Sequence, residues 1–390
     1  MFNLSETEIN TKKARYTIHE IQQQPELWEE LFMSIKTNRK NIDHFLQNLI
    51  DRFQSIRVIF TGAGTSEFAG NVITPLLRKN SHIPHLSYES IPTTDIVSDP
   101  LSFLLKDVPT VIVSFARSGD SPESVAAVNL ARKIIRNCFF ITITCNAKGS
   151  LARLMEKDDK CLTIIMPEKS NDKGFAMTSS FTCMLYAAYL VFIPEMTETT
   201  NRNLINTAIK FIKTCEKSVI RLEKFKFKRV IYLGSGALGK LTQEAALKCL
   251  ELNAGKIDTY HDSSMGFRHG PKSLQSDETL IILFGSSDSY TKMYDYDIAL
   301  EVASEPLTSK LAVLCSNIEV ENYSCADLTI PFYIVDSMHD NDLLRSFFCI
   351  LFSQIFALHH SLILGITPDN PSPDGKVNRV VQGVKIHDFN

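Results

Sequence analysis

Residues 230–252 read VIYLGSGALGKLTQEAALKCLEL. Its first four residues form a short apolar run that is typical of a buried β-strand. Gly234 and Gly236 follow, and glycines let the backbone turn tightly and approach a ligand closely. From Lys240 onward, apolar residues recur at helical spacing. The stretch therefore predicts a strand, a glycine turn and a helix whose first N–H groups can attract an anion.

The same pattern occurs earlier in the chain. VIFTGAG begins at Val58, 172 residues before VIYLGSG begins at Val230. Three more pairs of strand-like runs follow in the same order at similar offsets, beginning at Val111 and Leu280, at Phe139 and Lys310, and at Leu162 and Leu328. Four pairs in one order indicate a duplicated domain.

Helical stretches lie between these runs, at 121–135, 179–192 and 342–364. Strands that alternate with helices form parallel sheets with helices on both faces. We therefore predict an α/β fold of two tandem, doubly wound, flavodoxin-like parallel-sheet domains. The predicted divisions are a helical N-terminal arm at 1–45, a first domain at 46–205, a second domain at 206–365 and a C-terminal tail at 366–390. Ligands in such sheets bind at the carboxyl ends of the strands.

An acid, a lysine and a histidine follow the second glycine turn. Lys248 and Glu251 are three residues apart, so they share one face of the predicted helix. A glutamate that is partly desolvated there could have its pKa raised toward a value useful for a general base. His269 lies in the loop sequence His-Gly-Pro that comes after the helix. The alternatives are an ordinary surface Lys/Glu pair and a solvated loop histidine.

The first half carries the better anion cradle. After the strand 111–115 come Arg117, Ser118, Gly119 and Ser121, with a proline next that suits a first helical turn. Hydroxyls and free N–H groups at such a helix start can hold a phosphate, and the arginine adds positive charge. The turn at 62–66, which contains Gly64, Thr65 and Ser66, offers further hydroxyls from a neighbouring strand. Helix capping is the alternative for either turn, but two converging turns favour a phosphate site.

A dinucleotide site is the competing interpretation of the second turn. Residues 234–239, GSGALG, fit the pattern G-x-G-x-x-G after a strand. In the first half, however, Glu67 stands where the third glycine belongs. The next strand of the second half ends in Phe284-Gly-Ser-Ser, without an acid to bind a ribose hydroxyl. These departures disfavour nicotinamide binding.

Composition excludes several classes of protein. The 390 residues carry a net charge of −3, with 41 basic and 44 acidic residues, so no basic surplus exists for binding nucleic acid. The nine cysteines form no CxxC pair, which favours reduced thiols in a cytoplasmic protein. The longest apolar run, 183–193, is too short to cross a membrane, and the polar N-terminus is not typical of a secretory signal.

Six motifs together resemble the sugar isomerase (SIS) superfamily, in particular the isomerase half of glucosamine-6-phosphate synthase. The motifs are Gly64-Thr-Ser, Ala116-Arg-Ser-Gly-Asp-Ser, Cys145-Asn-Ala-Lys-Gly-Ser-Leu, Gly174-Phe-Ala-Met-Thr-Ser-Ser-Phe-Thr, Glu244-Ala-Ala-Leu-Lys-Cys-Leu-Glu and His269-Gly-Pro. The resemblance covers roughly residues 40–390 in order. The N-terminal arm and the tail 368–384 look closer to the galactosamine-6-phosphate deaminase/isomerase branch, also labelled tagatose-6-phosphate ketose/aldose isomerase.

The resemblance implies a role for each matching residue. Glu251 matches the base that moves a proton between C1 and C2 of the sugar, and Lys248 matches a lysine near the reacting oxygen. His269 matches the histidine that opens the sugar ring. In the synthase this histidine comes from a neighbouring subunit, so the resemblance implies a homodimer with shared active sites, with a tetramer left open.

The substrate-binding positions implied by the resemblance are Gly64, Thr65, Ser66, Arg117, Ser118, Gly119, Ser121, Thr178, Ser179 and Gln382. Three positions depart from the synthase pattern. Ala116 replaces a phosphate-binding serine, and Met177 replaces a serine of the sugar site. The reactive lysine of the synthase tail aligns, within about a residue, with Gln382, although the tail is still expected to close the active site.

The expected reaction needs no metal and no cofactor. It converts an amino-sugar 6-phosphate, D-galactosamine-6-phosphate in our interpretation, to D-tagatose-6-phosphate and ammonia. Two alternatives stay open. One is keto–aldose isomerisation of a neutral sugar phosphate without ammonia release. The other is a sugar-phosphate-binding regulatory protein without catalysis, against which the presence of both the acid and the histidine argues.

Overall fold

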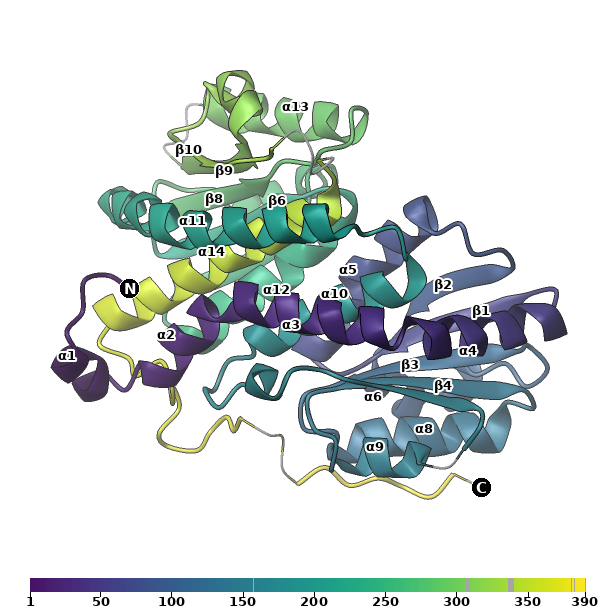
Figure 1. Cartoon of the computed structure of the whole chain (residues 1–390). Helices are drawn as coiled ribbons and strands as arrows, with labels where there is room; N and C mark the ends of the chain where they lie inside the picture. Colours follow the sequence, from purple (N-terminus) through teal and green to yellow (C-terminus); the bar gives the residue numbers. More distant parts are fainter. Residues whose placement is uncertain (157, 306–308, 336–339, 380, 382, 390) are drawn as a thin grey trace. The chain divides into compact units, whose positions relative to one another are not determined.

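The computed structural model describes all residues except 157, 306–308, 336–339, 380, 382 and 390 (Figure 1). The chain divides into two compact units. The first-sheet unit comprises Glu26–Asp172, Ser179–Met196 and Val377–Asn390. The second-sheet unit comprises Met1–Pro25, Lys173–Thr178 and Thr197–Lys376. Each unit therefore contains segments that lie far apart in the sequence.

The first-sheet unit contains a five-stranded parallel sheet in the order β2-β1-β3-β4-β5. Its strands are β1 (Ile56–Thr61), β2 (Leu86–Ser90), β3 (Thr110–Ala116), β4 (Cys138–Thr144) and β5 (Cys161–Ile165). Every residue of β3 and β4 is buried, as expected for central strands with both faces covered.

Helices cover both faces of this sheet. They are α3 (Gln24–Thr37), α4 (Arg39–Arg52), α5 (Thr65–Asn80), α6 (Thr93–Ser98), α7 (Pro100–Phe103), α8 (Pro122–Ile134), α9 (Ser150–Met155), η1 (Glu168–Ser170) and α10 (Ser179–Phe192). On one face, Ile59 and its neighbours pack with Val128 of α8. On the other face, Phe60 meets Phe192 of α10 edge to face, with ring centroids 5.7 Å apart. The alternation of Ile59 and Phe60 thus places one apolar side chain on each face.

The second-sheet unit repeats this architecture. Its sheet has the order β10-β9-β8-β6-β7 and is also parallel throughout. Its strands are β6 (Arg229–Gly234), β7 (Asp258–Ser263), β8 (Thr279–Phe284), β9 (Lys310–Ser316) and β10 (Leu328–Phe332). If β6 is matched to β1 and the others in sequence order, the two sheets have the same strand order. The predicted duplication and the predicted α/β fold class are confirmed.

Helices also lie on both faces of the second sheet. The elements are α1 (Glu6–Thr11), α2 (Arg15–Gln22), α11 (Glu198–Leu222), η2 (Glu223–Phe225), α12 (Gly236–Leu252), η3 (Gly266–Arg268), η4 (Pro271–Leu274), α13 (Thr291–Ser304), η5 (Asn317–Tyr323) and α14 (Asp342–Ile363). Ile298 of α13 packs with Ile231 and Ile281 on one face. On the opposite face, Phe211 of α11 meets Phe332 of β10 edge to face.

The helix α14 is the core helix of this unit. It is long and apolar enough to cross a membrane by length and composition, but 89% of its most apolar window is buried inside the structure. It packs against α2, α11 and α12. Phe348 lies edge to face with Phe211 of α11, with ring centroids 5.5 Å apart. Such burial is typical of the central helix of a globular unit.

The first 50 residues are helical, as predicted, but they do not form one separate body. Residues up to Pro25 belong to the second-sheet unit, and Glu26 begins the first-sheet unit. The buried carboxylate of Glu20 in α2 accepts a hydrogen bond from the N–H of Gly174 at 3.1 Å, which draws the segment 173–178 into the second-sheet unit. A Cβ at Gly174 would lie 2.9 Å from that carboxylate, so a larger residue there would have to displace the side chain of Glu20. The boundaries predicted at residues 45, 205 and 365 and the closing role of the tail stay predictions.

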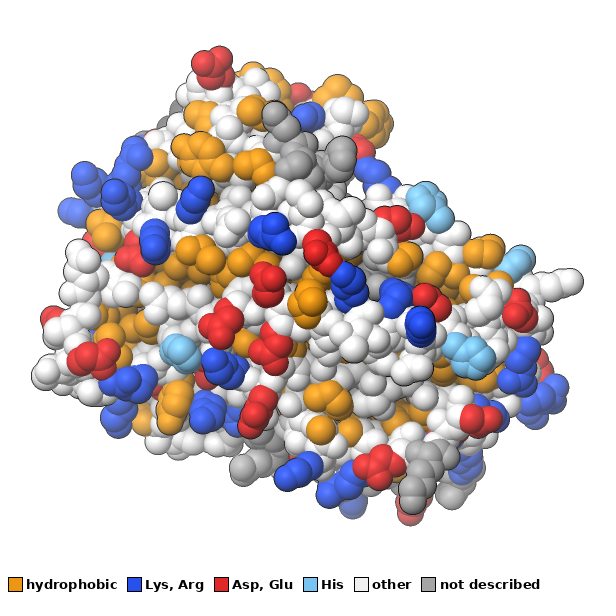
Figure 2. Space-filling view, in the orientation of Figure 1, with side chains coloured by type: hydrophobic (Ala, Val, Ile, Leu, Met, Phe, Trp, Pro, Cys, Tyr) orange, Lys and Arg blue, Asp and Glu red, His pale blue; other side chains and the backbone are white. Residues whose placement is uncertain are grey.

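Charges of both signs share the surface. On the face shown in Figure 2, acidic, basic and apolar side chains are interspersed. This pattern agrees with the near balance of 41 basic and 44 acidic residues in the sequence.

The buried His360 of α14 predicts a pH dependence of stability. Burial, together with His359, lowers the pKa of His360 to about 4. The unfolded chain binds a proton at this histidine near pH 6.5, whereas the folded chain does not. The free energy of unfolding should therefore fall as the pH drops from about 6.5 to about 4, by up to about 1.4 kcal/mol per pH unit.

His360→Phe should reduce this dependence and keep the ring contacts with Phe227 and Phe356. Urea unfolding at pH 7 and pH 5 measures the effect, with His44→Phe on the exposed side of α4 as the control. Equal losses of stability in wild type and His360→Phe would contradict the prediction.

Candidate active site

The helices α5 and α12 begin at equivalent turns after the first strand of each sheet. Gly64 precedes α5 with φ of 56°, and Gly236 opens α12 with φ of 57°. This left-handed conformation is costly for residues with a Cβ, so both turns depend on glycine. The two turns place the starts of both helices at the carboxyl ends of β1 and β6.

Three charged side chains form a line along α12. Lys248 is fully buried, and its Nζ lies 2.6 Å from an Oε atom of Glu251 and 3.3 Å from an Oε atom of Glu244. The side chain of Glu244 is also fully buried, whereas that of Glu251 is 24% exposed. Glu251 is therefore the member of the line that solvent, and hence a substrate, can reach.

Lys248 and Glu251 share one helix face, as predicted, and Lys248 is buried rather than at the surface, while the catalytic role of the pair stays a prediction. Burial alone lowers the pKa of Lys248, but the carboxylates of Glu244 and Glu251 outweigh it, so its pKa is raised. Lys248 therefore remains an ammonium ion between two carboxylates. Such a cation fixes the carboxylate of Glu251 in one orientation.

Sequence reasoning did not select Glu244 as a site residue. The signal was present, because a glutamate four residues before a lysine shares its helix face. Only the structure shows that both side chains are buried, which turns a surface pattern into an ion pair shielded from water.

His269 lies in a loop braced against α13. It ends the short helix η3, and its backbone N–H donates to the carbonyl of Gly266 at 2.9 Å. Arg268 pairs with Glu301 of α13 at 2.7 Å, and Lys272 pairs with the same glutamate. His269 itself is exposed. Among the described residues, its side chain makes no hydrogen bond or ion pair with the charged residues of α12, so its assistance in ring opening stays a prediction.

The two predicted phosphate turns lie at the same edge of the first sheet. β1 and β3 are parallel neighbours, and Thr61 is paired with Ser114 just before the two turns. Thr65 and Ser66 lie buried in the first turn of α5. Ser118 and Ser121 precede α8, with Gly119 between them at φ of 73°. The two turns therefore follow neighbouring strands at one edge of the sheet, and their convergence on a phosphate stays a prediction.

The hydroxyl of Ser121 does not act as a simple helix cap. Ser121 occupies the N-cap position of α8, but its hydroxyl donates to that of Ser124 at 2.6 Å. Arg117 is almost buried, and its guanidinium donates to the carbonyl of Arg379 in the tail at 2.7 Å. The hydroxyl of Ser118 accepts from the N–H of Asp120 at 3.3 Å, so the two hydroxyls make bonds within the turn rather than a simple cap of α8.

The remaining predicted binding residues are Thr178, Ser179 and Gln382. Thr178 and Ser179 are fully buried at the start of α10, and the N–H of Ser179 donates to Asp172 at 3.1 Å. Gln382 lies outside the described residues. The charged line of α12 belongs to the second-sheet unit, and the turns with Ser66 and Ser118 belong to the first-sheet unit.

The charged line predicts a strong coupling between Glu244 and Lys248. Lys248→Met should leave the buried Glu244 without its cation and lower the free energy of unfolding by about 3–5 kcal/mol. The double variant Glu244→Gln/Lys248→Met should recover most of this loss, because no buried charge is then left alone. Urea unfolding measures both variants. Lys240→Met, at an exposed position of the same helix, should change stability by less than about 0.5 kcal/mol. Additive effects of the two substitutions would contradict the coupling.

Comparisons with known proteins identify the family of the chain. Residues 53–194 match the SIS domain family. The chain is 39% identical over 381 residues, 95% of each protein, to the D-galactosamine-6-phosphate deaminase AgaS of Escherichia coli. It is 38% identical over 390 residues, 99% of this chain and 95% of the relative, to the protein of the same name from Shewanella sp. (strain ANA-3). A solved structure, the tagatose-6-phosphate ketose/aldose isomerase of Escherichia coli, aligns with a TM-score of 0.83 and 36% identity over 96% of both chains. The chain therefore belongs to the family of SIS-domain proteins named D-galactosamine-6-phosphate deaminase AgaS.

Proposed function

We propose that this chain is an enzyme that converts D-galactosamine-6-phosphate to D-tagatose-6-phosphate and ammonia. One observation carries the proposal: a buried ammonium, Lys248, holds the partly exposed carboxylate of Glu251 at 2.6 Å. That arrangement suits a positioned general base. The named relatives, which match over nearly the whole chain, supply the substrate.

The phosphate is bound by the two turns of the first sheet. Hydroxyls of Ser66, Ser118 and Ser121 and the N–H groups at the starts of α5 and α8 donate to its oxygens. Arg117 adds a positive charge beside the turn. These contacts anchor the substrate through a group that does not react.

The proton transfer is carried out by Glu251. In the open-chain sugar, Glu251 removes the proton from C2 while the aldehyde oxygen at C1 gains a proton, which gives an enolamine. Glu251 then returns the proton to C1, which gives the ketose iminium ion, and the nitrogen releases one proton to leave the ketose imine. This proton balances the one gained by the C1 oxygen. Water attacks C2 of the imine, and the C–N bond breaks to release ammonia and leave the ketone. Lys248 fixes Glu251 throughout, and His269 assists the ring opening that precedes these steps.

A second candidate reaction uses the same groups. The solved relative described as a tagatose-6-phosphate ketose/aldose isomerase favours interconversion of neutral sugar phosphates. In that case the proton moves between C1 and C2 through an enediol, and no C–N bond breaks. Glu251 and Lys248 keep their roles, so only the substrate distinguishes the two reactions.

The proposal also covers the assembly and the compartment. The enzyme acts as a homodimer with shared active sites, an arrangement supported by the resemblance of His269 to a histidine that crosses between subunits. The release of ammonia by water makes the overall reaction a hydrolysis. The compartment is the cytoplasm, supported by the nine cysteines, which are all free thiols.

Glu251→Gln should lower ammonia release from D-galactosamine-6-phosphate by at least about 10²-fold, because the amide cannot accept the C2 proton. A coupled ammonia assay measures the rate, with D-glucosamine-6-phosphate tested alongside. Glu321→Gln, an exposed glutamate of the same unit, is the control and should leave the rate unchanged. Wild-type activity in Glu251→Gln would contradict the role of Glu251 as the general base. If the wild type released no ammonia but interconverted neutral ketose and aldose phosphates, the second reaction would be correct.

The double variant Ser118→Ala/Ser121→Ala should weaken substrate binding without removing the base. Hydrogen bonds to a charged group contribute about 1.5–3 kcal/mol each, so KM should rise at least roughly 10-fold, with a smaller change in kcat. Steady-state kinetics measure both constants. Ser289→Ala, an exposed serine in the corresponding turn of the second sheet, should leave KM unchanged. An unchanged KM in the double variant would argue against the phosphate site.

A further inference from the structure

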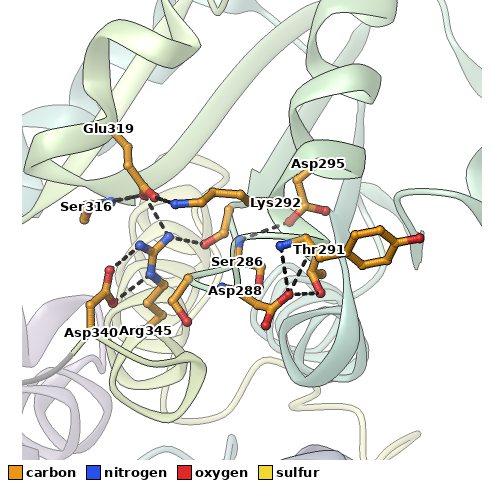
Figure 3. Close-up of polar contacts among 12 residues, drawn as sticks. Ser286, Asp288, Thr291, Lys292, Asp295, Ser316, Glu319, Asp340 and Arg345 are labelled. Atoms are coloured by element: carbon orange, nitrogen blue, oxygen red, sulfur yellow. Dashed lines mark hydrogen bonds and ion pairs between the residues drawn. The ribbon is translucent and has the colours of Figure 1, made fainter.

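The second sheet contains the counterpart of the phosphate turn, but carboxylates fill it. β8 matches β3 in the repeat, and the turn after β8 contains Ser286 and Ser287 where the turn after β3 contains Arg117 and Ser118. The turn is followed by α13, as the first turn is followed by α8. Figure 3 shows Asp295 and Asp288 at this turn, with Arg345 of α14 beside it.

Two aspartates accept the hydrogen bonds that the turn offers. Asp342, in the first turn of α14, accepts from the hydroxyl of Ser286 at 2.8 Å and from both the N–H and the hydroxyl of Ser287 at 2.7 Å. Asp295 of α13 accepts from the N–H of Ser286 at 3.0 Å. It also accepts from the hydroxyls of Ser235 at 2.5 Å and Ser264 at 2.6 Å. Six donors thus converge on two carboxylates.

These donors are of the kind that bind phosphate. Serine hydroxyls and backbone N–H groups at the carboxyl ends of parallel strands are the groups assigned to the phosphate in the first sheet. A carboxylate presents two anionic oxygens, so it can accept the same hydrogen bonds as two oxygens of a phosphate. Asp295 is fully buried and Asp342 is partly buried, so the protein's own carboxylates already accept these hydrogen bonds.

The neighbouring charges disfavour a phosphate here. Besides Asp295 and Asp342, the cluster contains Asp288, Glu319 and Asp340, against the two cations Lys292 and Arg345 (Figure 3). Five carboxylates against two cations give a formal excess of three negative charges. Glu319 and Asp340 are paired with Lys292 and Arg345, so the charge that repels a phosphate from the two serines is chiefly that of Asp342 and Asp295.

The glycine turns of the two sheets also differ in their hydroxyl groups. Gly64 and Gly236 are equivalent in sequence and have nearly equal φ angles. Thr65 and Ser66 follow the first glycine, whereas Ala237 and Leu238 follow the second. The second turn therefore lacks hydroxyls at the two positions that follow its glycine.

We infer that the turn after β8 is an anion-binding turn whose hydrogen-bond donors are taken up by the chain's own carboxylates, chiefly Asp342. The assignment of the first cradle to the substrate rests on the proposed function. The occupation of the second cradle by carboxylates rests on the six hydrogen bonds and does not depend on the proposed function.

Replacing the internal anion should create a site for an external one. Asp342→Ala removes three acceptor contacts and leaves space beside Ser286 and Ser287. Inorganic phosphate should then bind there and raise the melting temperature of Asp342→Ala by about 2–4 °C more than it raises that of the wild type. Thermal unfolding is measured in sodium phosphate and in sodium chloride of equal ionic strength. Phosphate bound at the first cradle contributes equally to both proteins, so the difference isolates the second.

Two variants control this experiment. Asp342→Asn keeps an acceptor oxygen and fills the space, so phosphate should give it no extra stabilisation. Asp327→Ala removes a carboxylate that pairs with Lys310 and accepts from the N–H of Leu311, at the amino end of β9. It should also gain no more from phosphate than the wild type. Equal phosphate shifts in Asp342→Ala, Asp327→Ala and wild type would overturn the inference.

A measurement on the wild type covers the case in which Asp342→Ala does not fold. Wild-type crystals soaked in tungstate, a phosphate analogue with a strong anomalous signal, should show no anion at Ser286 and Ser287. Tungstate at that turn would overturn the inference. Both readouts are independent of catalysis, so an absence of ammonia release would refute the proposed reaction and leave the occupied cradle intact.

Discussion

The buried ammonium of Lys248 between Glu244 and Glu251 is the constraint on which the site depends. An ion taken out of water loses several kcal/mol of solvation, which only well-placed partners can offset. The helix α12 must therefore keep both glutamates on the lysine's face and exclude water from the lysine. It does so by packing against β6 and β7 on one side and α14 on the other. The geometry of Glu251 is thus set by the fold of the whole second-sheet unit.

The position of α14 depends in turn on the polar cluster at its start. Arg345 is almost fully buried and donates to the carbonyl of Gly285 at 2.8 Å and to Asp340 at 2.9 Å. It also pairs with Glu319 at 2.9 Å. Together with Asp342, these contacts fasten the first two turns of α14 to the carboxyl ends of β8 and β9. An internally occupied cradle therefore helps to hold the helix that shields Lys248.

Sequence reasoning predicted the features that local periodicity and repetition determine. The strand-like runs at Val58 and Val230, with their glycine turns, predicted β1, β6 and the duplicated sheets. The spacing of Lys248 and Glu251 predicted that they share a helix face. It did not predict the burial that shields the ion pairs of the charged line from water. Hydrogen bonds between distant segments could not be predicted. Nothing in the sequence around Glu20 predicts that its carboxylate accepts from the backbone N–H of Gly174, 154 residues later. The sequence also did not predict which carboxylates accept from these serines. Ser235 lies 60 residues from Asp295, and Ser287 lies 55 residues from Asp342.

Duplication explains why the two sheets share an architecture and differ at their turns. Two identical copies would each offer a phosphate cradle, but the proposed reaction needs one phosphate and one base. A carboxylate on a following helix can replace the phosphate at an unused turn, because it satisfies the same donors at all times and needs no ligand. The backbone also differs between the two turns, since Gly119 has a φ of 73° where the second turn has Asp288, which is not left-handed. The second copy can then use its glycine turn to start α12 with the base, while the first copy keeps the hydroxyls of Thr65, Ser66 and Ser118 for the substrate.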